Sequence, residues 1–443
     1  MALRPKRIEP HDALVGLFDQ ARTGLAGSQI GWLSTLRQEN FKRFMALGWP
    51  TQRVEAWKYT NLTELAAAPL TLAQPAEVSE AELAPFLVPL AYRLVFINGH
   101  FAAGLSDLAR IEGATVTNLA DALESQAERL AFHFTDQGSE RALDCLNVAL
   151  CTGGAYIHVE ASRTPPVPLQ LLFVTTGDQA DGLASPRNII QLDDAAQLTL
   201  IETHVRLDER APVTNLVNHV NLGVQARLKH DRVQLGAANG TFIGRMHLRA
   251  AAESHYDQTL ACFSGALTRN ETLAEIDGGQ AHVGLNGMVF ARGIQMVDNV
   301  IKVDHKAADC TSDQHYKAVL TDRATNNFAG KIHVYPGAQK TNAYQSNNNL
   351  LLSPDVQVNT KPELEIYADD VKCSHGATAG ELEDSELFYL RSRGIDLVTA
   401  RSLMTYAFVG DVLERFADDN TRLMARNALL DHLPGGESLK EMA

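Results

Sequence analysis

Two side chains of metal-binding type stand close together late in the sequence, Cys373 and His375. If the backbone is extended there, residues two apart project from the same face, so the thiol and the imidazole point the same way. Thiolate and imidazole suit iron, zinc, copper and iron–sulfur clusters, and two donors leave coordination positions for a partner to fill. The pair is also compatible with a buried cysteine beside a hydrogen-bonded histidine, which is common in protein cores.

A second group, His305, Cys310 and His315, has spacings of five and five residues. These spacings match neither one face of a helix nor one face of a strand, so this group is a weaker metal candidate. The other three cysteines are expected in the core: Cys145, Cys151 and Cys262. The five cysteines contain no C-x-x-C, which argues against a disulfide framework or a self-contained zinc site. Any metal chemistry is therefore expected to be shared with another molecule.

The common catalytic signatures are absent from the sequence. Gly337–Thr341 reproduces only the tail of a phosphate-binding loop, so we expect this chain to bind no ATP. There is no dinucleotide-binding G-x-G-x-x-G at a strand-to-helix turn, no G-x-S-x-G and no H-E-x-x-H. The sequence thus gives no motif-based reason to expect an enzyme.

Charge and hydropathy narrow the range of partners. The chain has 443 residues and a net charge of −14, which does not favour nucleic acid or an anionic membrane surface. Acidic residues interrupt the N-terminal stretch where a signal peptide needs an apolar run. No segment reaches the roughly 18 apolar residues of a membrane helix. We therefore expect a cytoplasmic protein.

The periodicity of apolar residues divides the chain into four parts. Residues 1–90 are predicted to be mostly helical and include an aromatic corner at Trp57–Asn61. Residues 91–154 form a connection that opens with a strand and an Asn98-Gly99 turn. Residues 155–367 lose the helical period, and residues 368–443 regain it. In the last part Ser385 is predicted to cap a helix that stops at Gly394, and Asp396 to cap the next one.

Residues 155–367 are predicted to be all-β. Apolar residues alternate with polar ones from Val220 to Lys229, which predicts one strand with one buried face. Further strands are predicted at 189–205, 241–250, 259–267, 281–291, 294–303, 316–320, 328–334 and 350–352. Because no long helical pattern lies between them, a doubly wound α/β sheet is excluded, which leaves a sandwich, a barrel or a solenoid.

An ordered set of motifs resembles the SufB/SufD family of iron–sulfur cluster assembly proteins, and its SufD-type members in particular. The likeness covers nearly the whole chain, includes the Trp57–Thr60 corner, and is strongest from about His305 to Phe416. Its other parts are SDQHYK at 312–317, FAGKI at 328–332, AQKTNA at 338–343, LLLS at 350–353, PELEI at 362–366, the stretch 369–380 and LFYLRSRGI at 387–395.

The resemblance implies a mainly β fold, a right-handed parallel β-helix flanked by N-terminal and C-terminal helical regions. It implies a non-catalytic scaffold subunit in a SufB–SufC₂–SufD complex, in which an ATPase drives de novo iron–sulfur cluster assembly. The nascent cluster would be shared across the interface with a SufB-like subunit. The functional histidine of the family corresponds to His375, with Cys373 as its neighbour.

The resemblance also implies contacts beyond the cluster. The SufC-like ABC ATPase would dock on the C-terminal helices, with contact residues expected at Phe388, Tyr389, Arg391, Arg393 and Phe408. The family complex is associated with FADH2, for which this sequence has no motif. Where SufB-like members present a cysteine, this chain has Tyr344–Asn349, so we expect the accessory half of the site.

Two alternatives come from other classes of protein. A polysaccharide-cleaving β-helix would need paired carboxylates or basic residues along a groove and usually a secretory signal, and that signal is missing. A homodimeric SufD-type carrier of iron or clusters, acting without SufB, is compatible with the sequence.

Overall fold

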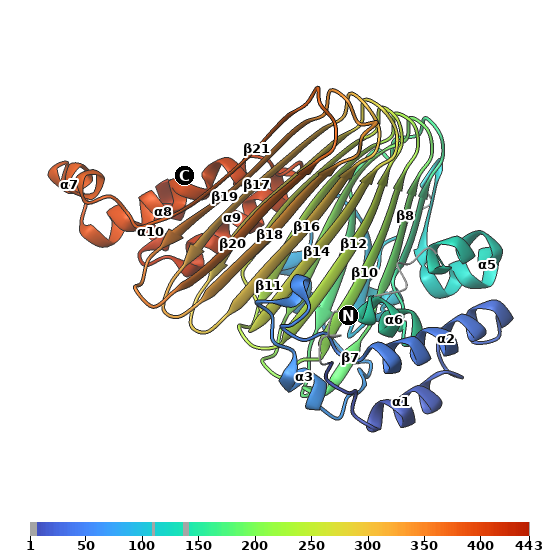
Figure 1. The fold of residues 1–443 in the computed structure, drawn as a ribbon. Helices are drawn as coiled ribbons and strands as arrows, with labels where there is room; N and C mark the ends of the chain where they lie inside the picture. Colours follow the sequence, from blue (N-terminus) through green and yellow to red (C-terminus); the bar gives the residue numbers. More distant parts are fainter. Residues whose placement is uncertain (1–6, 109–110, 136–140, 443) are drawn as a thin grey trace.

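The computed structural model describes residues 7–108, 111–135 and 141–442. Long parallel strands stack into a β-solenoid, with helices gathered beside its N-terminal and C-terminal parts (Figure 1). Successive strands alternate between two sheets, so each coil contributes one strand to each. The expected mainly β fold class is confirmed, and of the three architectures left open by the strand pattern the chain adopts the solenoid.

Both sheets run the length of the solenoid. The first contains β4 (Ala114–Asn118), β5 (Ala155–Val159), β8 (Arg187–Leu192), β10 (Val213–Leu222), β12 (Thr241–Ala250), β14 (Leu267–Ile276), β16 (Met296–His305), β18 (Thr325–Val334) and β20 (Gln357–Ile366), with β1 (Thr71–Leu72) and β7 (Gly182–Ala184) beside it. The second contains β2 (Tyr92–Ile97), β3 (His100–Phe101), β6 (Leu169–Thr175), β9 (Gln197–Arg206), β11 (Arg227–Gly236), β13 (His255–Cys262), β15 (His282–Ala291), β17 (Thr311–Leu320), β19 (Asn342–Leu351) and β21 (Lys372–Gly380).

The strands are in register from coil to coil. Leu267 pairs with Met296, and Met296 pairs with Thr325, so equivalent positions recur every 29 residues in these coils. Alternate side chains point into the solenoid, where those of Leu285 and Val303 belong to one continuous apolar core. Stacking therefore buries the inward face of every coil but the last.

The predicted strand across Val220–Lys229 is wrong, because it spans a corner between β10 and β11. Gln225 has a positive φ of 60° there, and its N–H donates to the carbonyl of Ala252 one coil later. Ala226, the small residue after the turn, is fully buried, so the apolar alternation continues through the bend. The predicted strands 189–205 and 259–267 also cross corners.

Most of the N-terminal helical segments lie on the outside of the first sheet, whereas the short segment 80–86 packs on the outside of the second. The helices are α1 (Ala13–Ala21), α2 (Gly31–Leu47), α3 (Thr63–Ala67), α4 (Glu80–Leu83), α5 (Leu119–Thr135) and α6 (Ala142–Ala149), with short 3-10 turns at Glu55–Trp57, Ala84–Phe86 and Ala103–Leu105. The aromatic corner docks on the sheet, where the Arg269 guanidinium lies 3.8 Å from the centre of the Trp57 ring. The Asn98-Gly99 hairpin is present, with both residues at positive φ as a tight turn requires.

Of the helices that follow the solenoid, the second and third pack on the outside of the second sheet, whereas the first projects away from it (Figure 1). In chain order the helices are α7 (Asp384–Ser392), α8 (Leu397–Leu413), α9 (Asp419–His432) and α10 (Gly436–Met442). Asp396 caps α8 as predicted and Gly394 has the expected positive φ of 87°, but Ser385 caps nothing, because α7 begins one residue earlier. β21 lies beyond residue 367, in the part expected to be helical. Its small and polar residues give little apolar alternation.

Candidate functional site

The solenoid ends in an uncovered coil made of β20 and β21. These strands pair with β18 and β19 respectively, and in the described part of the chain nothing pairs with their other edges. Most residues of both strands are exposed or half-buried, whereas the equivalent inward positions of β19 are buried. The end of the molecule is thus an open layer of backbone donors and acceptors and of inward-facing side chains.

Cys373 and His375 lie on the inward face of this last coil. Cys373 pairs with the buried Ala343, and His375 pairs with the buried Gln345. Because paired residues in parallel strands project to the same side, both ligand candidates face along the solenoid interior, as their two-residue spacing predicts. The ring of His375 remains exposed since no further coil covers it.

The surroundings of the two candidates differ. Cys373 is half-buried against an apolar cluster that includes Ala343 and Leu364. Burial raises the pKa of its thiol, and a backbone hydrogen bond at Ala343 partly offsets this. No group of three or more histidine, cysteine or acidic side chains within the described ranges is placed to hold a metal ion. The pair thus provides two convergent donors and an incomplete coordination sphere.

The structure separates His305, Cys310 and His315. His305 is buried and contacts the Ser312 hydroxyl through Nε2 at 2.8 Å. Cys310 fills a buried corner position and donates to backbone carbonyls. His315 lies on the outer face and bonds Asp411 of α8 at 2.9 Å. These residues have different structural contacts and form no common site.

The other three cysteines are buried, as expected for core residues: Cys145, Cys151 and Cys262. Burial raises the pKa of the Cys145 thiol to about 11 and that of Cys262 to about 12. Such thiols are poor nucleophiles and poor metal ligands at neutral pH, because the thiolate is the reactive form.

The residues expected to contact an ATPase fall into two environments. Phe388 and Tyr389 are 74% and 58% exposed on α7, which projects away from the solenoid (Figure 1). Arg393 lies over the Tyr389 ring at 5.2 Å, and Arg391 is exposed nearby. Phe408 instead packs against the solenoid, where the Lys317 ammonium is 5.0 Å from its ring centre. Of the expected contact residues, those on and next to α7 are therefore accessible to a partner, whereas Phe408 is partly covered.

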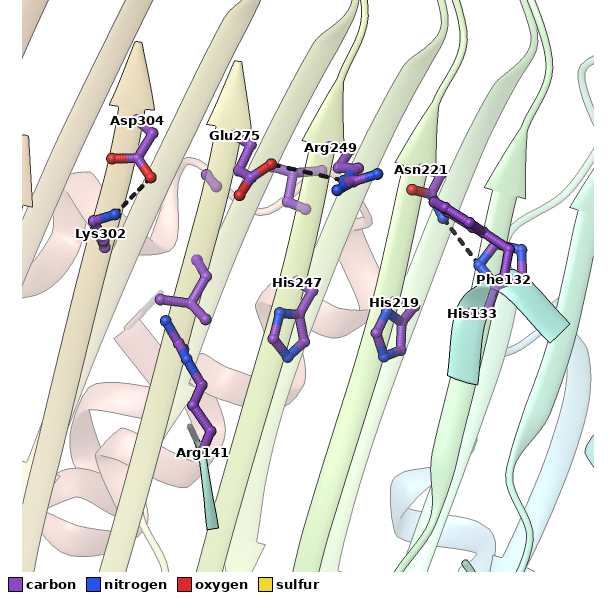
Figure 2. A pocket seen from close by; sticks show the side chains of 13 residues that line it. Phe132, His133, Arg141, His219, Asn221, His247, Arg249, Glu275, Lys302 and Asp304 are labelled. Carbon is purple, nitrogen blue, oxygen red and sulfur yellow. Dashed lines mark hydrogen bonds and ion pairs between the residues drawn. The ribbon is translucent and has the colours of Figure 1, made fainter. Parts of the chain in front are cut away.

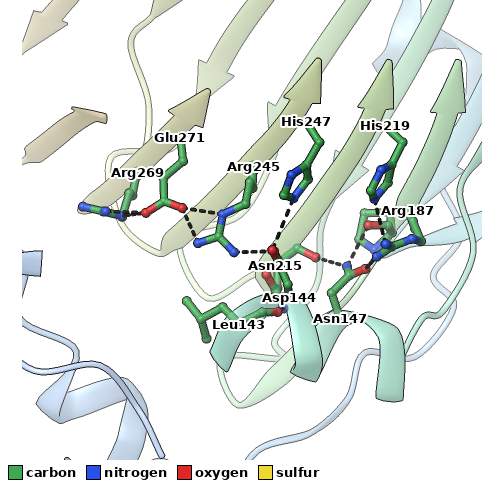
Figure 3. Close-up of polar contacts among 11 residues, drawn as sticks. Leu143, Asp144, Asn147, Arg187, Asn215, His219, Arg245, His247, Arg269 and Glu271 are labelled. Carbon is green, nitrogen blue, oxygen red and sulfur yellow. Dashed lines mark hydrogen bonds and ion pairs between the residues drawn. The ribbon is translucent and has the colours of Figure 1, made fainter. Parts of the chain in front are cut away.

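A buried polar network lies on the outer face of the first sheet and was not predicted from the sequence (Figure 3). Arg245 joins Asp144 of α6 to Glu271, and Glu271 also pairs with Arg269. Burial alone would raise the pKa of Glu271, but the two arginines lower it to about 2. Asp298 accepts from Arg269 and from Thr60, so the chain of charges ties α6 and the N-terminal corner to the sheet.

Two cavities lie along the same face. One, of about 150 Å³, is lined by the stacked rings of His219 and His247 among charged side chains (Figure 2). The other, of about 530 Å³, lies between the N-terminal corner and the sheet, in the size range of ligand sites. Its rim lysines are paired with carboxylates: Lys302 with Asp304, Lys331 with Glu365, and Lys361 with Glu363. Because these pairs already neutralise the lysines, they are poorly suited to bind a flavin pyrophosphate.

Comparison with known proteins matches two regions of the chain to one family. Residues 173–408 match the family described as "SUF system FeS cluster assembly, SufBD core domain", and residues 8–171 match "SufBD protein N-terminal region". The chain is similar to the iron–sulfur cluster assembly protein SufD of Escherichia coli, with 29% identity across 90% of this chain and 93% of that protein. It is 31% identical to an iron–sulfur cluster assembly SufBD family protein of Synechocystis, over 91% of each. SufD of Bacillus subtilis is 23% identical across 86% of this chain and 90% of its own length.

Within the described residues, no helix combines the length and apolar character needed to cross a membrane. The two matched regions together cover most of the chain, and the solenoid with its flanking helices has the architecture expected from the resemblance. The chain therefore belongs to the SufBD family and has a role in iron–sulfur cluster assembly through the Suf system.

Proposed function

We propose that this chain is the accessory scaffold subunit of a SufB–SufC₂–SufD type complex, in which it lends His375 to a nascent cluster at the interface with a SufB-like subunit. The observation that carries the proposal is the uncovered last coil, which presents two inward-facing donors and no complete metal site among the described residues. A cluster held by ligands from two chains is stable while they touch and is released when they separate.

The open edge supports a solenoid-to-solenoid contact. β21 is nine residues long, and one of its edges has no strand partner among the described residues. Such an edge pairs readily with another chain. An edge contact would bring the partner's side chains to His375, which lies in the middle of β21.

The projecting α7 supports the ATPase contact. Phe388 and Tyr389 are large, exposed aromatic side chains on a helix that stands clear of the body, and aromatic anchors of this kind dominate protein interfaces. In the proposed complex the ATPase docks on this helix, so its movements reach the solenoid through α8, which packs on β15 and β17.

Reconstitution tests the proposal. The full chain, wild type or His375→Ala, is co-expressed with SufB- and SufC-type subunits, and iron and sulfide are quantified anaerobically. We expect His375→Ala to assemble the complex but to build clusters several-fold more slowly, and Cys373→Ser to have a milder defect. Ser374→Ala is the matched control, since Ser374 lies between them and faces outward.

Cluster formation by His375→Ala at the wild-type rate would contradict the proposal. The same measurement on the chain expressed alone separates the alternative function. A homodimeric carrier acting without SufB would retain iron or a cluster by itself, whereas the proposed scaffold needs the second subunit.

A further inference from the structure

A buried amide with an unpartnered oxygen lies directly behind His375. Gln345 occupies the position of β19 that pairs with His375. Gln345 is 3% exposed, and its Nε2 donates to Oε1 of Gln314, one coil deeper, at 2.7 Å. Its own Oε1 has no hydrogen-bond partner in the described part of the chain. Buried carbonyl oxygens are nearly always paired, so an orphaned one next to a candidate ligand calls for an explanation.

The position of this amide is fixed on two sides. The nitrogen is held by Gln314, and a Cβ atom at Gly330 of the facing strand would overlap the Gln345 amide. The absence of a side chain at Gly330 is therefore what gives the amide its space. The nitrogen of the planar group is bonded to the coil below and its oxygen is unpartnered, and the residue in register with Gln345 in the next coil is His375.

We propose that Gln345 is a positioning residue for His375, whose imidazole N–H donates to Gln345 Oε1 once a partner covers the last coil. This inference rests on the proposed function. A neutral imidazole has one N–H and one lone pair. When the N–H is bound inside the solenoid, the lone pair on the other nitrogen faces the open end, where the shared cluster would form. Metal-ligating histidines generally use their second nitrogen in this way.

The neighbouring positions show why Gln345 is distinctive. Cys373 pairs with Ala343, which offers no side-chain hydrogen bond, and Asn347 pairs with Ala377, which has no donor. Asn347 is equally buried, at 2%, and already accepts from Asn349. Along this strand, Gln345 alone combines an unpartnered buried acceptor with a ligand-type residue in register.

Three variants in the complete complex test the inference. Gln345→Met keeps the approximate volume but removes the amide acceptor. Gln345→Glu keeps an acceptor, and the Gln314 amide can turn to donate, because its Nε2 is unpartnered among the described residues. Asn347→Leu is the matched control, removing a buried amide two residues away on the same face.

The first readout is the dissociation constant of ferrous iron, titrated anaerobically. The second is the magnetic coupling between the bound iron and the remote ring nitrogen of His375, the one that does not bind the metal, in ¹⁵N-histidine-labelled complex. This coupling reports the hydrogen bond of that nitrogen and would not respond to a general loosening of the fold. We expect Gln345→Met to weaken iron binding about 10- to 100-fold and to change the coupling. Gln345→Glu and Asn347→Leu should stay close to wild type in both.

Wild-type iron binding and coupling in Gln345→Met would overturn the inference, as would equal weakening by Asn347→Leu. If Gln345→Met does not fold, Gln345→Asn, which withdraws the acceptor by one methylene, takes its place with the same expectation. His375→Ala separates the positioning role of Gln345 from the proposed function of His375. A defect in His375→Ala with none in Gln345→Met refutes only the positioning role, whereas no defect in His375→Ala refutes the proposed function itself.

Discussion

One proline in the free edge of β21 tests whether that edge carries the partner contact. The N–H of Lys372 donates to Thr341, toward β19. Because successive backbone N–H groups of a strand point to opposite edges, the N–H of Ala377 faces the free edge. Ala377→Pro therefore removes a donor from the interface without breaking the β19 ladder. The preceding Gly376 has no Cβ, so the restriction that proline places on its predecessor is small.

The expected magnitude follows from the bonds involved. One backbone hydrogen bond contributes about 1 kcal/mol net, and leaving the partner's carbonyl unsatisfied in a buried interface costs about 1–3 kcal/mol. A loss of about 1–3 kcal/mol corresponds to an affinity for the SufB-like partner that is about 5- to 150-fold weaker. Ala377→Val adds bulk but keeps the N–H, so it is expected to bind nearly as wild type.

Titration calorimetry of the purified full chain against the SufB-like subunit gives the dissociation constants, and thermal unfolding verifies that each variant is folded. Unchanged affinity for a folded Ala377→Pro protein would refute pairing through this edge.

β20 provides an internal comparison, since the N–H of Gln357 donates toward β18 and position 362 therefore faces the free edge. That position is naturally Pro362, which is tolerated because no sheet bond is lost there.

Three further predictions concern stability. Asp231 accepts hydrogen bonds from the backbone N–H groups of Ala417 and Asp418 at the start of α9, so Asp231→Ala should lower the free energy of unfolding by about 1–3 kcal/mol. Hydrogen exchange in α8 and α9 should become faster, and unchanged exchange there would contradict this anchoring role. Glu202 is fully buried and pairs with Arg232 at 2.9 Å, so Glu202→Gln should lower the free energy of unfolding in urea by about 3–5 kcal/mol; a loss below 1 kcal/mol would disprove the pairing energetics. Burial lowers the pKa of His305 to about 4, so the unfolded chain binds the proton more tightly and the free energy of unfolding should fall by up to about 1.4 kcal/mol per pH unit from pH 6.5 toward 4. In His305→Gln this contribution to the pH dependence should vanish, and parallel pH slopes for variant and wild type would refute it.

The fold was predictable in class because alternation and resemblance agreed, but the strand pattern alone could not locate the corners. The stretch Val220–Lys229 keeps its apolar alternation through a turn, since Ala226 is buried just as a strand residue would be. Only the pairing of equivalent positions one coil apart distinguishes corner from strand. β21 was missed for the opposite reason, because its small polar residues carry no periodic apolar signal while its backbone still pairs with β19.

The candidate site was predictable where it depended on local spacing. Residues two apart in an extended chain share a face, and this placed Cys373 and His375 correctly relative to each other. The supporting amide of Gln345 could not be found in this way, since it lies 30 residues before His375 and reaches it through strand register. A 29- to 31-residue comparison along the sequence, aligning Gln314, Gln345 and His375, is the signal that would reveal it.

The two ends of the solenoid differ in how their strand edges are protected from pairing with another chain. At the first end, β3 and β4 run antiparallel to their neighbours and helix α5 packs on β4, so little regular edge is left for another chain. At the other end β20 carries Lys361, Glu363 and Glu365, charges of the kind that discourage edge pairing. β21 has no charged residue after Lys372, and it contains His375 near its middle. The only solenoid edge in the described structure without such protection is thus the one that presents the ligand. It follows that a second copy of the chain and a SufB-like subunit would compete for the same strand, and that excess SufB-like subunit should dissociate any homodimer formed in isolation.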